Sequence, residues 1–388
     1  MKKYTYLLIL LVLAGSCKDK AIQPSLDCSG YGNYSSHPKA GAFAAVLDKY
    51  SKKGIPGISL LVKDASGTWA GASGMADIKE NISMQPCHVA KVASITKIFM
   101  ATLTFKLAEE GVLNIDEKIS SYLPSDIISK VKNAEQVTLR QLLSHNSGIY
   151  DVISDNGFYL GVLNNPDKNW TSKELLNYVE NKEAAFAPGE GPGYSNTNTL
   201  LVALIIDHVT KRPHAQLLKE KIINPLGLKD TYYYYHDALP EGRIAQGYYD
   251  LYNNGSIVNL SNYNTGSGNG YTGLYTTVFD MYTFIDALLV QESILSPNSL
   301  NQMKDFNPKE ETEKLLGAGL FKDFIHHPSN EFAIGHRGRD LAYSADLFYF
   351  PNKNQVMSLI VNYGTDADSR LRPAFYELRD EIVTTMMQ

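Results

Sequence analysis

Ser94 and Lys97, in the stretch ASITKIF, have the residue types and the spacing that nucleophilic catalysis needs. On a helix, positions i and i+3 lie on one face, so the hydroxyl and the amine can meet. A serine hydroxyl is a weak nucleophile until a neighbouring base takes its proton. A lysine can be that base only where burial or nearby positive charge lowers its pKa. The apolar neighbours Ile98 and Phe99 favour such burial.

The four-residue pattern alone is weak, because it occurs three times in the chain. Ser36/Lys39 lies beside a proline in a polar segment without helical periodicity. Ser129/Lys132 lies at the end of a polar, surface-like helix, so we expect ordinary side chains at both places. The match at Ser94 begins a long apolar helical pattern, whose free backbone N–H groups also suit an oxyanion. The alternative there is a serine N-cap followed by a solvated lysine.

Two further short patterns carry groups that acyl transfer needs. Tyr194 and Asn196 lie in a Gly- and Pro-rich loop, PGEGPGYSNTN, before a strongly apolar helical run. A tyrosine hydroxyl can move a proton, and an asparagine amide can hold a substrate carbonyl. His336 and Gly338 lie on an expected strand, where glycine lets a ligand approach closely. Each pattern has a structural alternative, since Tyr-x-Asn occurs elsewhere in the chain and a lone histidine is more often a packed side chain.

The segments around these residues predict strands at both ends of the chain. Residues 57–64 and 67–77 read as two strands joined by a turn, and 332–338, 343–351 and 355–364 read as three consecutive strands. Between them, helices and loops predominate. The clearest helical patterns lie at 40–54, 94–113, 138–149, 171–186, 198–212, 275–289 and 372–388.

The three short patterns occur in the order in which they stand in the serine β-lactamase and penicillin-binding-protein superfamily, which this chain resembles. The flanking phrases LRQLLSHNSGI, NPLGLKDTYY, GLYTTVFDMYTF and GHRG add to the likeness. The nearest branch is the class C β-lactamase-like group, which includes D-Ala-D-Ala carboxypeptidases, D-aminopeptidases and esterases. The resemblance covers roughly residues 40–385.

This resemblance implies a catalytic role for each patterned residue. Ser94 attacks the substrate carbonyl and is acylated, and Lys97 helps to deprotonate it. Tyr194 acts as base or acid and passes a proton to the leaving group. Asn196 hydrogen-bonds the substrate amide. His336 stands where the family more usually has lysine, and it supports Tyr194.

The strand that carries the histidine departs from the family pattern. Backbone N–H groups of Ser94 and Arg339 would form the oxyanion hole, beside Gly338. Arg337 and Arg339 replace small residues, and two interpretations are open. They bind a substrate carboxylate by bidentate hydrogen bonds, as a C-terminal D-amino acid would require, or they are bulky residues that narrow the site. Lys91 stands where arginine is common, and we expect it to be a structural surface charge.

The implied fold is α/β plus all-α. An antiparallel sheet flanked by helices is built from both chain ends, with a helical subdomain inserted, as in β-lactamases and transpeptidases. Within a domain of residues 38–388, we expect the α/β part at about 38–112 and 266–388 and the helical insertion at about 113–265. The tyrosine-rich stretch 232–275 either walls the cleft or packs as ordinary loops.

The N-terminus reads as a targeting segment. Residues 1–16 have two lysines, a short apolar run and small residues, which predicts a lipoprotein signal peptide with Cys17 as the lipidated residue. A plain secretory signal is the alternative. Residues 17–37 are polar and read as a tether. We therefore expect an exported lipoprotein anchored to a bacterial membrane, facing the periplasm or the cell exterior. In such an oxidising compartment Cys28 and Cys87 could pair.

Together these observations favour an exported serine hydrolase that forms an acyl-enzyme on Ser94. We expect a D-Ala-D-Ala carboxypeptidase or D-amino-acid peptidase acting on cell-wall-type peptides. A carboxylesterase or β-lactamase of the same fold is the alternative, and a non-catalytic binding lipoprotein is a further one. The expected substrates are small peptides, esters or β-lactams, with no metal or organic cofactor. A net charge of −5 without a Lys/Arg-rich run gives no reason to expect nucleic acid.

Overall fold

The computed structural model describes residues 26–32, 34–306 and 315–388. The expected signal peptide, the lipidation site Cys17 and the first part of the expected tether lie outside these residues. In the described part of the chain, every helix is too short or too polar to cross a membrane.

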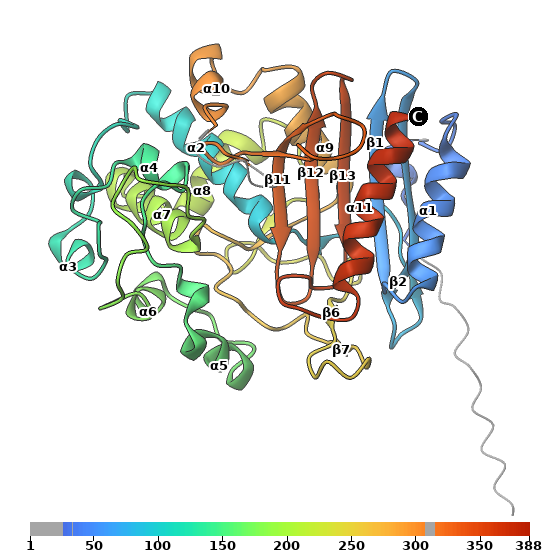
Figure 1. The fold of residues 1–388 in the computed structure, drawn as a ribbon, viewed down its shortest axis with the longest axis horizontal. Helices are drawn as coiled ribbons and strands as arrows, with labels where there is room; N and C mark the ends of the chain where they lie inside the picture. The colour runs from blue at the N-terminus through green and yellow to red at the C-terminus, as the bar shows by residue number, and fades with distance from the viewer. Residues whose placement is uncertain (1–25, 33, 307–314) are drawn as a thin grey trace, which may run out of the picture.

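Within the described residues, an eight-stranded antiparallel sheet runs through the middle of the molecule (Figure 1). Its order is β3-β2-β1-β13-β12-β11-β10-β9, so strands from both ends of the chain meet at its centre, where Ile58 pairs with Val361. The antiparallel sheet expected from both chain ends is confirmed. Its strands are β1 (Gly57–Asp64), β2 (Gly67–Asp77), β3 (Ile82–Ser83), β9 (Leu315–Leu316), β10 (Phe321–Asp323), β11 (Ala333–Arg339), β12 (Ser344–Phe350) and β13 (Gln355–Val361).

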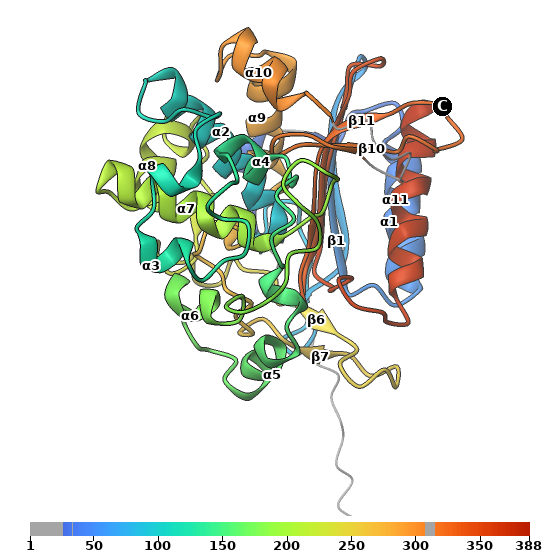
Figure 2. The same cartoon turned by 60° about the vertical axis from the view of Figure 1, so that its left-hand side comes forward.

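Helices cover both faces of this sheet, which explains why its central strands are apolar without alternation (Figure 2). Helices α1 (Ala40–Lys52) and α11 (Arg372–Met387) pack side by side on one face. Helix α9 (Val278–Ile285) and the helical part of the chain lie on the other. Strand β13 accordingly buries its last six residues in succession, as expected for a strand covered on both sides.

Helix α2 (Thr96–Glu109) passes between the sheet and helix α7 (Asn196–Thr210). Nearly all of its side chains are buried, including Thr102 and Thr104, whose hydroxyls donate to backbone carbonyls one turn earlier. A helix that is enclosed on all sides makes a rigid support for whatever stands at its first turn.

Two helices expected in the middle of the chain are shorter than their sequence patterns. Helices α4 (Leu139–Leu143) and α6 (Ser172–Asn177) each begin with a capping box, at Thr138 and Thr171. Helix α4 ends early because His145 adopts a positive φ of 54°, which no α-helix continues. The pattern predicts where each helix begins but not the tertiary contact that ends it.

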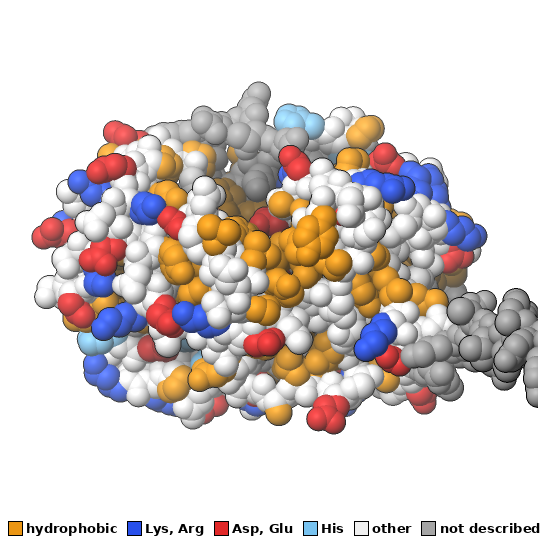
Figure 3. Space-filling model, turned by 90° about the horizontal axis from the view of Figure 1, so that it is seen from below, with side chains coloured by type: hydrophobic (Ala, Val, Ile, Leu, Met, Phe, Trp, Pro, Cys, Tyr) orange, Lys and Arg blue, Asp and Glu red, His pale blue; other side chains and the backbone are white. Residues whose placement is uncertain are grey.

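The remaining elements are short. On the face seen from below, hydrophobic side chains gather in the middle and both signs of charge are interspersed around them (Figure 3). A small sheet has the order β4-β8-β5, and β6 pairs with β7. These elements are α3 (Ser125–Ile128), α5 (Asn156–Asn164), α8 (His214–Leu218), α10 (Pro297–Met303), β4 (Ala90–Lys91), β5 (Tyr232–Tyr233), β6 (Tyr248–Tyr249), β7 (Val258–Asn259) and β8 (Leu274–Thr276), with 3-10 or π turns at Ser29–Tyr31, Ala93–Ile95, Ile119–Ser121, Val152–Ser154, Lys219–Ile223 and Asp286–Val290.

The described end of the expected tether is held against the domain. A disulfide joins Cys28 to Cys87, so the pairing that the sequence left open is present. The His37 ring is buried and its Nε2 lies 2.9 Å from the Asp64 carboxylate. The disulfide and this buried pair therefore hold the two ends of the described segment against the domain.

Candidate active site

Ser94 lies in a tight 3-10 turn directly before helix α2, and its side chain is half-buried. The preceding residue, Ala93, has a φ of +49°, in the left-handed region that non-glycine residues seldom adopt. The Thr96 hydroxyl closes this turn by donating to the Ala93 carbonyl at 2.7 Å. Strained backbone of this kind is concentrated at functional sites, so the turn presents Ser94 rather than merely capping a helix.

Gly338 supports this turn from strand β11. A Cβ at that position would lie 2.1 Å from the Val92 carbonyl oxygen, so only glycine lets the strand approach this closely. The close approach expected of Gly338 is therefore to the backbone beside Ser94.

Lys97 reaches Ser94 from one turn along the helix. Its Nζ donates to Ser94 Oγ at 3.0 Å, to Asn196 Oδ1 at 2.7 Å and to the Tyr271 carbonyl at 2.8 Å. All three acceptors are neutral. Burial lowers the pKa of Lys97 to about 7, because the charged ammonium loses hydration that these dipoles only partly replace. Lys97 is therefore placed and tuned to accept the Ser94 proton.

Tyr194 contacts the same hydroxyl. Burial raises the pKa of its phenol, and a hydrogen bond with the Ser94 side chain acts in the other direction. The Lys97 ammonium lies 5.1 Å from the centre of the Tyr194 ring. The ring of His145 packs against the phenol with centroids 4.4 Å apart. Two titratable side chains thus converge on Ser94 with their pKa values shifted in opposite directions.

Asn196 is held in one orientation by charged groups on both ends of its amide. Its Oδ1 accepts from Lys97, while its Nδ2 donates to both carboxylate oxygens of Asp151 at 3.1 and 3.2 Å. Asp151 also accepts from the Asn196 backbone N–H at 3.0 Å. The predicted substrate-binding amide is therefore part of a chain from Asp151 to Lys97, and Asp151 was not foreseen from the sequence.

His336 contacts the site through an aromatic stack. Its ring packs on Phe321 at 4.2 Å, and Phe321 meets the Tyr194 ring edge-on at 5.7 Å. The centroids of His336 and Tyr194 lie 6.3 Å apart. The Nδ1 atom of His336 lies 2.6 Å from the Arg337 carbonyl oxygen, which fixes the ring plane. Phe321, on strand β10, is a second residue that no local pattern indicated.

The two strand arginines line the pocket, but their guanidinium groups are engaged with the protein. Arg337 forms a two-pronged ion pair with Asp323, with Nη2 at 2.5 Å from Oδ1. Arg339 Nη2 donates to Asp346 at 2.8 Å, and its Nη1 donates to the Gly338 and Ala345 carbonyls. This geometry favours the interpretation in which both arginines narrow the site over the one in which they bind a substrate carboxylate.

Lys91 is not a surface charge, which corrects the expectation from its residue type. Only 3% of it is exposed, and its Nζ lies 2.5 Å from the Asp340 carboxylate. It also donates to the Thr265 hydroxyl at 3.1 Å. These partners offset the cost of burying the charge. They come from distant segments of the chain, so a sequence pattern cannot reveal them.

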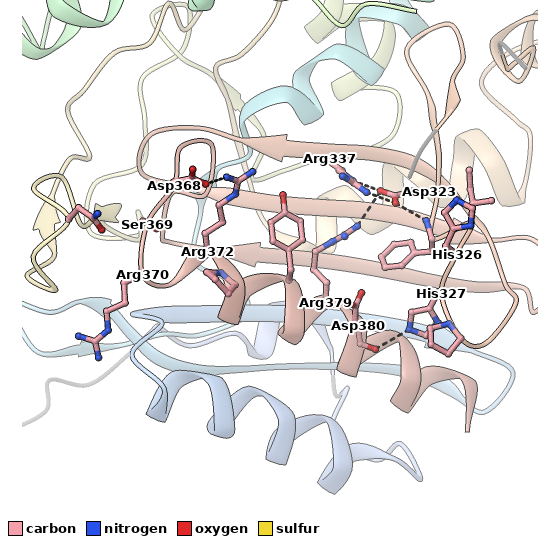
Figure 4. A pocket seen from close by; sticks show the side chains of 16 residues that line it. Asp323, His326, His327, Arg337, Asp368, Ser369, Arg370, Arg372, Arg379 and Asp380 are labelled. Atoms are coloured by element: carbon pink, nitrogen blue, oxygen red, sulfur yellow. Dashed lines mark hydrogen bonds and ion pairs between the residues drawn. The ribbon is translucent and has the colours of Figure 1, made fainter. Parts of the chain in front are cut away.

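One cavity contains the reacting groups, and a larger groove adjoins it. The one that contains Ser94 has a volume of about 210 Å³. A larger groove of about 910 Å³ runs beside it along α11, where Arg337 and Arg379 point at Asp323 and Arg372 points at Asp368 (Figure 4). The smaller cavity is lined by Ser94, Ile153, Tyr194, Asn196, Phe321, Arg337, Arg339, Thr365, Asp366, Arg372 and Tyr376, and it shares Arg337, Arg372 and Tyr376 with the groove.

Among the described residues, no group of three or more His, Cys, Asp or Glu side chains is placed to hold a metal ion. In the tyrosine-rich stretch, Tyr271 contacts Lys97 through its carbonyl, and its ring centre lies 5.6 Å from the ammonium. The exposed Tyr252 and the buried Tyr233 of the same stretch lie outside both cavities.

Comparison with known proteins agrees with this geometry. The family model described as Beta-lactamase matches residues 43–379. Protein flp of Staphylococcus aureus strain MW2 is 30% identical over 203 residues, which are 50% of this chain and 39% of that protein. The D-alanyl-D-alanine-carboxypeptidase/endopeptidase AmpH of Escherichia coli K12 is 27% identical over 194 residues, 48% of this chain and 49% of AmpH. These matches therefore span half or less of the curated relatives.

Solved structures match over more of the chain. The D-amino acid amidase from Ochrobactrum anthropi SV3, in complex with L-phenylalanine amide, has a TM-score of 0.79 at 27% identity, covering 89% of this chain and 97% of the amidase. A D-stereospecific amidohydrolase from Streptomyces sp. has a TM-score of 0.76 at 27% identity, covering 84% and 95%. The fold is thus that of β-lactamase-like hydrolases.

Proposed function

The chain belongs to the Beta-lactamase family of serine hydrolases, and from this we propose that Ser94 forms an acyl-enzyme with amides or peptides of D-amino acids. The observation that carries the proposal is the contact at Ser94. Lys97 Nζ lies 3.0 Å from the hydroxyl, and burial lowers the pKa of Lys97 to about 7. A large share of Lys97 is then neutral at physiological pH and can act as a base.

In this mechanism Lys97, not Tyr194, accepts the first proton. Burial raises the pKa of Tyr194 above its ordinary value, so its phenol stays protonated near neutral pH. As Ser94 Oγ attacks the substrate carbonyl, its proton passes to Lys97. Tyr194 then gives its proton to the leaving nitrogen and is reprotonated from Lys97, so the C–N bond breaks with a neutral amine as the product. Water hydrolyses the ester by the same path in reverse.

The other residues position these three. Backbone N–H groups of Ser94 and Arg339 are the proposed oxyanion hole. Asn196 is held between Asp151 and Lys97, and the second lone pair of its amide oxygen can accept a hydrogen bond from the substrate. His336 keeps Tyr194 in place through the packed ring of Phe321.

The proposed substrate class is supported by the names of the similar proteins. Two solved relatives are described as acting on D-amino acid amides or with D-stereospecificity, and AmpH is described as a D-alanyl-D-alanine peptidase. The proposal takes two forms, carboxypeptidase action at a D-Ala-D-Ala end or hydrolysis next to an amino-terminal D-residue. Export and lipid anchoring at Cys17 are part of the proposal, and residues 1–17 support them.

Intact-mass spectrometry of a protein beginning at Lys18 tests the nucleophile. A fluorophosphonate or a penicillin should add one adduct to the wild-type protein and none to Ser94→Ala. Equal labelling of both proteins, or labelling of neither by either probe, would contradict an acyl-enzyme at Ser94. Release of product from D-alanine amides, p-nitrophenyl esters and nitrocefin then separates amidase or peptidase action from esterase and β-lactamase action.

A further inference from the structure

The charges that line the catalytic cavity are paired, with one exception. Ser94 lies in the cavity of about 210 Å³ and also lines a small adjoining one. Five charged residues line the two, and Asp366 lines both. Within the described part of the chain the other four form the following ion pairs: Arg337–Asp323, Arg339–Asp346, Arg372–Asp368 and Asp340–Lys91.

Asp366 forms no ion pair among the described residues, although it lies beside the reacting groups. Its Oδ2 accepts a hydrogen bond from the Tyr159 hydroxyl at 2.9 Å. Tyr159, on α5, also lines the small cavity. The contact fixes one carboxylate oxygen and leaves the other available to a ligand. A carboxylate supplied with only one neutral donor is well suited to a cationic partner.

The balance of charge also argues against a carboxylate ligand in this cavity. Arg337 donates from Nε and Nη2 to Asp323, and Arg339 donates from its two terminal nitrogens to Asp346 and to backbone carbonyls. A substrate carboxylate beside Asp366 would meet a like charge, and the arginines that line this cavity already have carboxylate partners. An ammonium group in the same place would meet the Asp366 carboxylate, which is an opposite charge.

The sizes of the two cavities indicate which part of the substrate lies where. The cavity at Ser94 is about 210 Å³, whereas the adjoining groove is about 910 Å³. The small one suits a single acyl residue, and the groove offers room for a leaving group of varied length. An α-ammonium on the acyl residue lies only two bonds from the carbonyl that Ser94 attacks, so it falls within the same small cavity as Asp366.

We propose that Asp366 binds the α-ammonium group of the substrate, so that the enzyme acts on amides and peptides whose D-residue has a free amino group next to the scissile bond. The inference rests on the proposed acyl-enzyme at Ser94 and selects its amino-terminal form. Tyr159 is a positioning residue that orients the Asp366 carboxylate.

The test compares D-alanine p-nitroanilide with N-acetyl-D-alanine p-nitroanilide. Wild-type protein should prefer the free amine. Asp366→Asn should lower kcat/KM for the free amine about 10- to 100-fold, the range of a lost charged hydrogen bond, and leave the acetylated substrate nearly unchanged. Tyr159→Phe should give a smaller loss of the same kind. Asp167→Asn, which removes an exposed carboxylate outside both cavities, is the matched control for net charge.

Fluorophosphonate labelling of Ser94 separates the possible failures. If wild type and Asp366→Asn both label but wild type prefers the acetylated substrate, the inference is overturned and the acyl-enzyme proposal stands. The inference is equally overturned if Asp366→Asn lowers kcat/KM for both substrates by the same factor. If Ser94 in the wild-type protein does not label, the proposed function itself fails. If Asp366→Asn still labels but loses kcat/KM only for the free-amine substrate, both the acyl-enzyme at Ser94 and the ammonium site at Asp366 are supported.

Discussion

Two buried lysines flank the Ser94 turn, and their partners differ. Lys91 is 3% exposed and lies 2.5 Å from the Asp340 carboxylate. Lys97 is 2% exposed and donates to a hydroxyl, an amide oxygen and a backbone carbonyl. Burial is nearly the same for both, so the partner decides what each lysine does.

The difference follows from the cost of burying a charge. A carboxylate at contact distance compensates the lost hydration of a buried ammonium. Neutral dipoles compensate less, and the pKa of Lys97 falls to about 7. Lys91 is therefore a structural strut under the site, while Lys97 can give up its proton there.

The largest effect is expected from replacing each lysine by arginine, which keeps the positive charge but cannot lose its proton. Lys97→Arg should slow acylation of Ser94 by about 10³-fold, because arginine does not lose its proton in proteins. The rate of fluorophosphonate labelling measures it. Lys91→Arg, which can still pair with Asp340, should stay within about 10-fold of wild type. Comparable labelling rates for Lys97→Arg and wild type would remove Lys97 as the base.

A second change removes the ion pair between Lys91 and Asp340 instead. Lys91→Met leaves the buried Asp340 without a counter-charge and should reduce the free energy of unfolding by about 3–5 kcal/mol. The double variant Lys91→Met/Asp340→Asn should recover much of this loss. Urea denaturation followed by circular dichroism gives the values. No loss in the single variant would mean that the pair does not support the fold.

The smallest expected effect is a shift in pH dependence. Neutral Lys97 is the active form, so acylation of Ser94 should rise with pH through about 7 and level off above it. The charge of Asp151 raises the pKa of Lys97. Asp151→Asn should therefore move the rising limb to lower pH, read from labelling rates between pH 5 and 9. A limb that moves to higher pH would contradict this coupling.

Local patterns predict the parts of the site that local sequence builds. Ser94 and Lys97 meet because one helical turn separates them, and the long strands follow from alternation and turn residues. Asp151, Phe321 and Asp366 come from separate loops or a short strand and carry no motif, so only the folded chain brings them to Ser94. His145 stands in a phrase that supported the family resemblance, yet its contact with Tyr194 depends on a positive φ.

Lys91 shows the limit most clearly. Lysine is rarely buried, so residue type alone predicts a surface charge. For a related reason, the sequence could not decide whether Arg337 and Arg339 bind a substrate carboxylate or narrow the site. Whether an arginine is free to bind a ligand depends on acceptors such as Asp323 and Asp346, which the sequence does not place beside it.

The pairing of β1 with β13 has a consequence for how the protein is made. The β1–β2 hairpin is synthesised long before β13, its other neighbour in the sheet. Until then β1 presents an unpaired edge, which is open to wrong partners. Contacts this distant in sequence also make folding slow. The strand that carries His336 joins the sheet through the same late segment, so a nascent chain holds its nucleophile well before it can hold a catalytic site.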